Sequence, residues 1–183
     1  MNPKIKAAPD RRPLKPDSKN SKKLPYRKTS AVKLLEVMAN EAARAKYPNT
    51  PPEWLAPRKY RDDTANALTK CVIDFLKLSG HQAERISNTG RIIDRRQTFT
   101  DVLGNRRQVG STKWIKGTGT NGTADISATI AGKSVKIEVK IGRDRQSQAQ
   151  RRYQEEVEAA GGVYVIAATF EGFYDWYNQN FKR

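Results

Sequence analysis

Residues 123–141 constrain the fold most, because apolar and polar residues alternate there along two short segments separated by a glycine turn. Period-two alternation is typical of strands with one buried face. The apolar positions are Ile126, Ala128 and Ile130 in the first segment and Val135, Ile137, Val139 and Ile141 in the second. The connection at Ala131-Gly132 is short, so the two segments are predicted to form an antiparallel hairpin. A slip of one residue would turn one apolar set toward water, so the pattern also predicts the register.

The predicted register brings polar side chains from both strands together on the opposite face. A two-residue loop places Asp125 directly across from Glu138, with Lys140 beside them. Carboxylate oxygens are the ligands that Mg²⁺ takes in proteins, usually only one or two of them. This face is therefore predicted to bind Mg²⁺ or Mn²⁺ next to a positive group. The alternative is an exposed Glu–Lys pair on an ordinary hairpin, which would contribute little to stability.

The same residues resemble a known nuclease signature. Asp125 followed by Glu138-Val139-Lys140 resembles the D…(D/E)-x-K motif of the PD-(D/E)xK nuclease superfamily. Ser147-Gln148-Ala149-Gln150, at the start of a predicted helix, resembles the VRR-NUC branch, which is Holliday junction resolvase-like. Gly-Thr-Ala-Asp before the hairpin and Gly-Gly-Val-Tyr-Val-Ile after the helix also fit, and the resemblance covers roughly residues 64–168.

The resemblance implies a site as well as a fold. It implies an α/β protein with a restriction-endonuclease-like αβββαβ core and a small mixed sheet. The implied catalytic residues are Asp125, Glu138, Lys140 and Gln150, and the backbone carbonyl of Val139 would join the two carboxylates in binding metal. Proteins of this branch usually carry a glutamate on the first core helix, where this chain has Asn66 or nearby Ala65. Asn66 would then be a neutral oxygen ligand; the alternative is a polar residue that simply starts a helix.

The helices are predicted from apolar spacing and from capping residues. One begins at Ser30 as N-cap, and the next runs over 64–79 with Asp62 or Asp63 as cap. A third covers 147–160, where Ser147-x-x-Gln150 also reads as a capping box, so an active-site role for Gln150 competes with a structural one. A strand over 163–168 follows. Aromatic residues from Phe170 to Phe181 then recur at helical spacing and predict a C-terminal helix that covers the core.

The net charge of +16 indicates a polyanionic partner, and DNA is the expected one. Residues 1–30 hold ten Lys and Arg against two Asp with almost nothing apolar, which predicts a disordered basic arm. The arm either binds nucleic acid or is a solvated tail without a specific role. Residues 31–60 are predicted to be a helical extension with a Pro-rich linker, and 61–183 the nuclease-like domain.

A second hairpin is predicted over residues 98–109, around Gly104-Asn105. Basic residues bracket it and suit contact with phosphates, with an aromatic, Trp114, close behind. The alternative is a solvated hairpin that charge protects from aggregation. The candidate nucleic-acid-binding residues are Arg95, Arg96, Arg106, Arg107, Lys113, Lys116 and Arg143.

Other functions are excluded or not expected. With Cys71 and His81 as the only cysteine and histidine, neither an intrachain disulfide nor a Cys/His zinc site can form. The glycine-rich segment 117–123 lacks the Lys-Ser/Thr of a phosphate loop, so no nucleotide cofactor is expected. No apolar run approaches a membrane span. The sequence thus predicts an intracellular, metal-dependent DNA endonuclease, with a binding module on a nuclease fold as the alternative and a homodimer left open.

Overall fold

The computed structural model describes residues 25–87, 90–117 and 119–182. Its centre is a four-stranded mixed sheet in the order β1-β6-β7-β8. The strands are β1 (Gln82–Arg85), β6 (Ile126–Ile130), β7 (Lys133–Val139) and β8 (Val163–Ala167). The first three strands are antiparallel, and β8 runs parallel to β7 because the helix between them returns the chain to the same end of the sheet.

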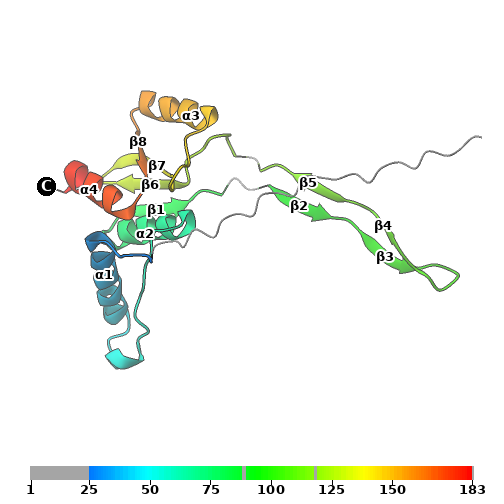
Figure 1. Cartoon of the computed structure of the whole chain (residues 1–183), viewed down its shortest axis with the longest axis horizontal. Helices are drawn as coiled ribbons and strands as arrows, with labels where there is room; N and C mark the ends of the chain where they lie inside the picture. Colours follow the sequence, from blue (N-terminus) through cyan, green and yellow to red (C-terminus); the bar gives the residue numbers. More distant parts are fainter. Residues whose placement is uncertain (1–24, 88–89, 118, 183) are drawn as a thin grey trace, which may run out of the picture.

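Helices cover both faces of this sheet. They are α1 (Ser30–Lys46), α2 (Ala65–Leu78), α3 (Gln148–Ala159) and α4 (Phe170–Phe181), with a short 3₁₀ turn, η1 (Pro52–Trp54), after α1. Figure 1 shows α3 on one side of the sheet, and α2 with α1 on the other. The molecule is thus a mixed α/β protein, as predicted.

The hairpin of β6 and β7 has the predicted register. Ile126 pairs with Ile137, and Ile130 pairs with Lys133, which leaves two residues in the turn. Ala131 and Gly132 both have positive φ, 48° and 80°, as a tight primed hairpin turn requires. The predicted apolar face is buried except for Ile141, which lies two residues beyond the end of β7 and is half-buried.

The core lies between this apolar face, α2 and α4. The predicted α2 positions Leu68, Val72, Phe75 and Leu76 are buried. The ring of Phe75 makes edge contacts with four aromatic rings of α4, those of Phe170, Phe173, Tyr174 and Tyr177. The prediction that the C-terminal aromatic helix covers the core is therefore confirmed. Cys71 is fully buried, in agreement with a core role, and burial raises the pKa of its thiol to about 12.

Two predicted caps are wrong. Thr29, not Ser30, caps α1, and Thr64, not Asp62 or Asp63, caps α2 by accepting a hydrogen bond from the Ala67 amide at 3.3 Å. Thr64 takes this role because it directly precedes the helix, where its Oγ1 reaches the orphan amides.

Asp62 instead serves as a buried junction. Its carboxylate accepts hydrogen bonds from the hydroxyl of Tyr26 at 2.8 Å and from the backbone amide of Phe170 at 3.1 Å. It thereby connects the segment before α1 to the start of α4. The predicted basic arm lies mostly outside the described residues, but its last residues are bound to the folded body.

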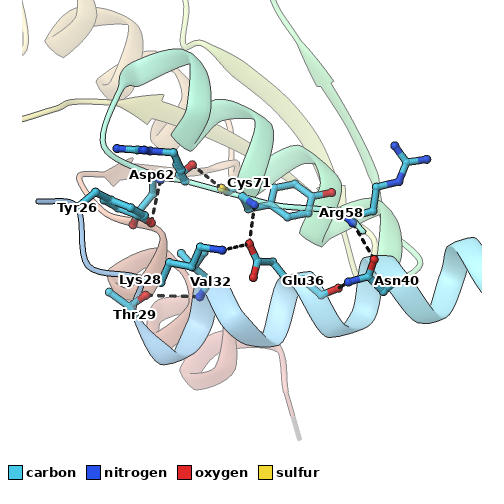
Figure 2. Close-up of polar contacts among 11 residues, drawn as sticks. Tyr26, Lys28, Thr29, Val32, Glu36, Asn40, Arg58, Asp62 and Cys71 are labelled. Carbon is cyan, nitrogen blue, oxygen red and sulfur yellow. Dashed lines mark hydrogen bonds and ion pairs between the residues drawn. The ribbon is translucent and has the colours of Figure 1, made fainter. Parts of the chain in front are cut away.

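The linker after α1 is fastened to that helix by side chains of α1 (Figure 2). Glu36 accepts hydrogen bonds from Lys28 and from the amide of Tyr60, and Asn40 accepts one from the amide of Arg58 at 2.8 Å. These bonds satisfy backbone groups of a loop that has little secondary structure of its own.

The second hairpin is present and longer than predicted. The pairing strands are β3 (Gln97–Thr100) with β4 (Arg106–Val109), and β2 (Arg91–Asp94) with β5 (Thr112–Ile115). Together they form a two-stranded arm, residues 91–115, that projects away from the sheet and its helices (Figure 1). Within the described part of the chain, no helix has both the length and the apolar character needed to cross a bilayer.

Candidate active site

The β6–β7 hairpin brings Asp125 and Glu138 together at one end of the sheet. Asp125 immediately precedes β6, and its Oδ2 accepts a hydrogen bond from the backbone amide of Val139 at 2.9 Å. That bond orients the Asp125 carboxylate toward the neighbouring strand. It is also, among the described residues, the only hydrogen bond that this carboxylate makes.

Glu138 is the most buried charged residue of the site, with 2% of its surface exposed. Its Oε1 accepts hydrogen bonds from Nε2 of Gln150 and from Nζ of Lys140, the latter at 3.1 Å. Its Oε2 is also buried without a well-formed hydrogen bond, and so is the hydroxyl of Tyr164, which interacts with the Glu138 carboxylate. A buried carboxylate oxygen without a partner is costly, and such atoms are rare in native proteins unless an ion, water or catalytic role accounts for them.

Burial, and then the negative charge of Asp125, raise the pKa of Glu138 above its ordinary range. Lys140 opposes this shift without cancelling it. The charge of Asp125 thus disfavours the ionised form of Glu138, and a cation placed beside the two carboxylates would favour that form.

Lys140 is held on both sides by carboxylates. Its ammonium lies 3.1 Å from Glu138 and 3.2 Å from Asp144, and only 12% of the side chain is exposed. Burial by itself would lower the pKa of Lys140, but the hydrogen bonds to Glu138 and Asp144 raise it above its ordinary value. Lys140 is therefore an ammonium ion at neutral pH, which suits charge neutralisation rather than proton abstraction.

Gln150 completes the predicted capping box and also contacts Glu138, while its active-site role stays a prediction. Its Oε1 accepts a hydrogen bond from the backbone amide of Ser147, completing the capping box, while its Nε2 donates to Glu138. The start of α3 is thus coupled directly to the buried carboxylate.

The glycine-rich segment before β6 packs against this same helix start. Gly122 has a φ of +83°, and a Cβ at this position would lie 2.4 Å from the backbone of Ala149. The glycine thus lets the loop backbone touch the first turn of α3, one residue before Gln150.

Two residues near the carboxylates were not predicted from the sequence. Asp144 holds Lys140, and its place in an irregular loop gave no periodic signal. Tyr164 of β8 is buried, and its ring packs edge-on against Tyr153 of α3 at 6.4 Å. Burial and the charge of Glu138 raise the pKa of Tyr164 to about 12. An aromatic hydroxyl inside an otherwise aliphatic strand was the signal that could have found it.

Asn66 lies in the first turn of α2, as predicted, but is engaged elsewhere. Its Oδ1 accepts a hydrogen bond from the Arg85 guanidinium at 2.9 Å, and the residue is exposed. Among the described residues, no three Asp, Glu, His or Cys side chains cluster closely enough to form a metal-binding group. The predicted acidic cluster is therefore a pair of carboxylates, and the roles of Asn66 and of the Val139 carbonyl in metal binding remain predictions.

The predicted nucleic-acid-binding residues lie in two places, and all are exposed: Arg95, Arg96, Arg106, Arg107, Lys113 and Lys116 on or next to the arm, and Arg143 in the loop after β7. Within the arm, Arg96 pairs with Asp94 at 2.6 Å, and hydrogen bonds from Arg96 lower the pKa of Asp94 to about 2. Arg107 pairs with Asp101 at 2.9 Å. Only Arg143 lies close in sequence to the carboxylate pair.

The fold and site define a mixed α/β protein in which Glu138, buried at one end of the sheet, contacts the half-buried Lys140 and Gln150 and lies beside a second carboxylate, Asp125. Comparison with models of known protein families gives no match, and no curated protein matches the chain. A functional assignment therefore depends on the residues and their geometry.

Proposed function

We propose that this chain is a metal-dependent DNA endonuclease of the PD-(D/E)xK type, VRR-NUC-like, that hydrolyses phosphodiester bonds and prefers branched DNA such as junctions or flaps. The observation that carries the proposal is the buried, unpartnered Oε2 of Glu138 beside Asp125. An ordinary exposed Glu–Lys pair would leave no such atom, because water would solvate it. A chain that maintains this arrangement retains a destabilising group at one place, as functional sites commonly do.

The order of elements supports the same proposal. From α2 onward the body of the protein runs α2, β1, β6, β7, α3, β8, with the arm inserted between β1 and β6. This is the αβββαβ order that the nuclease resemblance implies. Asp125, Glu138 and Lys140 occupy the hairpin at its centre, and Gln150 begins the following helix.

The two carboxylates fit a hard divalent cation. Glu138 Oε2 and the second oxygen of Asp125 are the candidate ligands, and the Val139 carbonyl is the third implied by the resemblance. When bound, Mg²⁺ or Mn²⁺ would acidify a water molecule and offset charge that develops on the phosphate. Asn66 could contribute its amide oxygen only by giving up its hydrogen bond to Arg85.

The chain's own residues have distinct roles in this proposal. Lys140 keeps its proton and places positive charge next to the scissile phosphate. Gln150 holds Glu138 Oε1, so that Oε2 keeps its position. Asp125 is held by the Val139 amide. Arg143 and the two-stranded arm, residues 91–115, bind phosphates farther along the DNA.

The test is a cleavage panel of single-stranded, duplex, flap and four-way-junction DNA with Mg²⁺, Mn²⁺, Ca²⁺ or EDTA. We expect cleavage with Mg²⁺ or Mn²⁺, none in EDTA, and binding without efficient cleavage in Ca²⁺. Robust cleavage in excess EDTA would contradict the metal assignment.

A second candidate is a nucleic-acid-binding module without catalysis. It is favoured by one observation: the amide oxygen of Asn66, which with nearby Ala65 stands where the resembled nucleases usually carry a glutamate, is already hydrogen-bonded to Arg85. Such a module would bind the same DNA panel with salt-dependent affinity but would cleave none of it at any Mg²⁺ concentration.

A further inference from the structure

The arm exposes apolar side chains along its whole length. Two-stranded ribbons are marginally stable in water at best, so this arm gains from a partner. Its exposed apolar residues are Ile92, Phe99, Val102, Leu103, Val109, Trp114 and Ile115. Residues 91–115 also carry six Lys and Arg against two Asp, a net charge of +4. The surface is both basic and apolar.

The tip of the arm presents two aliphatic residues on a well-organised loop. Val102 and Leu103 are 103% and 80% exposed, the most solvent-accessible large apolar residues described. Asp101 organises this loop: its Oδ1 accepts hydrogen bonds from the amides of Leu103 and Asn105, and its Oδ2 accepts one from Arg107. A turn needs polar or glycine residues for its backbone, but nothing in its geometry requires two aliphatic side chains that point into water.

We propose that the arm lies along a groove of duplex DNA and that Val102 and Leu103 insert between base pairs where stacking is already broken, as at a junction, nick or flap. The inference depends on the proposed function only in taking DNA as the partner. Apolar side chains of this kind act as wedges in other DNA-binding proteins, and unstacking costs least at a distorted site.

The dimensions of the arm suit this placement. The strands pair from Arg91 with Ile115 to Thr100 with Arg106, and no residue is inserted in either strand between the two ladders. At roughly 3.3 Å per residue, this length is about 33 Å, close to one turn of B-DNA. The major groove admits a two-stranded ribbon.

The positive charge of the arm favours DNA, rather than a second copy of the chain, as the partner of this surface. Of the arm's cations, Arg91, Arg95, Arg106 and Lys113 form no ion pair with any described residue and are available to phosphates. Two arms of net charge +4 would repel each other. The face of the β3–β4 ladder that carries Arg106 is otherwise Thr98, Thr100 and Gln108, all able to hydrogen-bond to phosphates or base edges.

The experiment compares full-length wild type with Val102→Ser/Leu103→Ser. The matched control is Val37→Ser, which changes an aliphatic residue that is 51% exposed but lies on α1, outside the arm. Affinity is measured in Ca²⁺ for a four-way junction and for a perfect duplex of the same sequence, with 2-aminopurine placed at the branch point. Sedimentation velocity of each free protein is recorded in parallel.

Wild type should favour the junction and brighten the 2-aminopurine. The tip variant should lose roughly tenfold or more of that preference, together with the fluorescence change, while duplex affinity stays nearly constant. Val37→Ser should retain both signals. A tip variant with unchanged preference and fluorescence overturns the inference, as does wild type that binds no DNA, or a tip variant that alters self-association and not DNA binding. If these signals appear as expected but Mg²⁺ gives no cleavage, the nuclease proposal fails and the wedge stands.

Discussion

At the scale of single residues, Glu138 lowers the stability of the folded protein, although the proposed function requires its carboxylate. Its buried position and the neighbouring Asp125 raise the pKa of Glu138, so the folded protein holds its proton more tightly than the unfolded chain does. A group with a raised folded pKa stabilises the protein most below its unfolded pKa, about 4.3 for glutamate, and that stabilisation is lost as pH rises through the folded pKa. As pH rises above the unfolded pKa, Glu138 therefore costs stability, unless a bound cation compensates its charge.

Glu138→Gln removes this ionisation while preserving shape. The variant should be at least as stable as wild type at pH 7 in EDTA, and its loss of stability from about pH 4 upward should be shallower. Cleavage should be lost. The measurement is urea unfolding at several pH values, with the exposed Glu84→Gln as control. Parallel pH profiles of Glu138→Gln and wild type would contradict the expectation.

Lys140 tests chemistry apart from DNA binding. Lys140→Ala removes the ammonium next to Glu138 and should lower the cleavage rate roughly 10²-fold or more, by analogy with the loss of one charge-stabilising donor. DNA affinity should change little, because one cation is a small part of a net charge of +16. The control is Lys136→Ala, on the same face of β7 but bonded to Ser127 at 2.6 Å. Equal decreases in the two variants would mean that Lys140 has no special role.

Asn66 tests the third ligand. Asn66→Glu should lower the Mg²⁺ concentration for half-maximal cleavage if the side chain reaches the metal, because it adds a charged oxygen. Asn66→Ala should raise it. If Asn66 serves only to bind Arg85, the introduced glutamate would form an ion pair with Arg85 instead, and neither variant would change the Mg²⁺ requirement. Mg²⁺ titrations of cleavage for the three proteins, with melting temperatures as control, decide between these outcomes.

At the scale of elements, sequence patterns predicted what is local and missed what is not. The register of the β6–β7 hairpin followed from alternation and a two-residue turn, and it brought Asp125 and Glu138 together. The cap of α2 was assigned to Asp62 or Asp63 because several capping residues lie in succession there. Asp62 is instead recruited by Tyr26 and Phe170, 36 and 108 residues away, and no local pattern reports such partners.

The packing of the loop before β6 on α3 can be tested by substituting Gly122, with Gly132, which has a similar backbone φ, as the control. Gly122→Ala would force a Cβ to within 2.4 Å of the Ala149 backbone and move the start of α3, and with it Gln150. Gly132→Ala has nearly the same φ, +80°, but nothing within 4 Å, so it should cost only about 1 kcal/mol of backbone strain. We expect Gly122→Ala to lower both the melting temperature and the cleavage rate clearly more. Equal effects would show that the packing of the loop on α3 is unimportant.

At the scale of the whole molecule, most of the positive charge lies outside the candidate site. The two-stranded arm, residues 91–115, extends away from the sheet (Figure 1), and Arg143 lies in the loop after β7, five residues beyond Glu138 in the sequence. Residues 1–24 add eight Lys and Arg against two Asp, a net of six positive charges. If DNA is the partner, as proposed, electrostatic attraction should supply most of the affinity for it, and the arm tip and the β6–β7 hairpin would add branch recognition and chemistry.

Two N-terminal truncations distinguish the effect of this charge on DNA binding from its effect on stability, because the described contacts of the N-terminal segment begin only after residue 24. Deleting residues 1–24 removes the six net charges but no described interaction. The slope of log K for DNA binding against log salt should flatten by up to about 5, at about 0.9 for each phosphate that is no longer neutralised, with the melting temperature unchanged.

Deleting residues 1–30 also removes the Tyr26 hydroxyl from Asp62 and the Thr29 cap from α1, which should cost a further ~2–4 kcal/mol of stability. Salt titrations of DNA binding and urea unfolding of both truncations give the two readouts. An unchanged salt slope for the shorter truncation would show that this segment does not bind DNA, whereas equal stability of the two truncations would show that Tyr26 and Thr29 do not fasten α1.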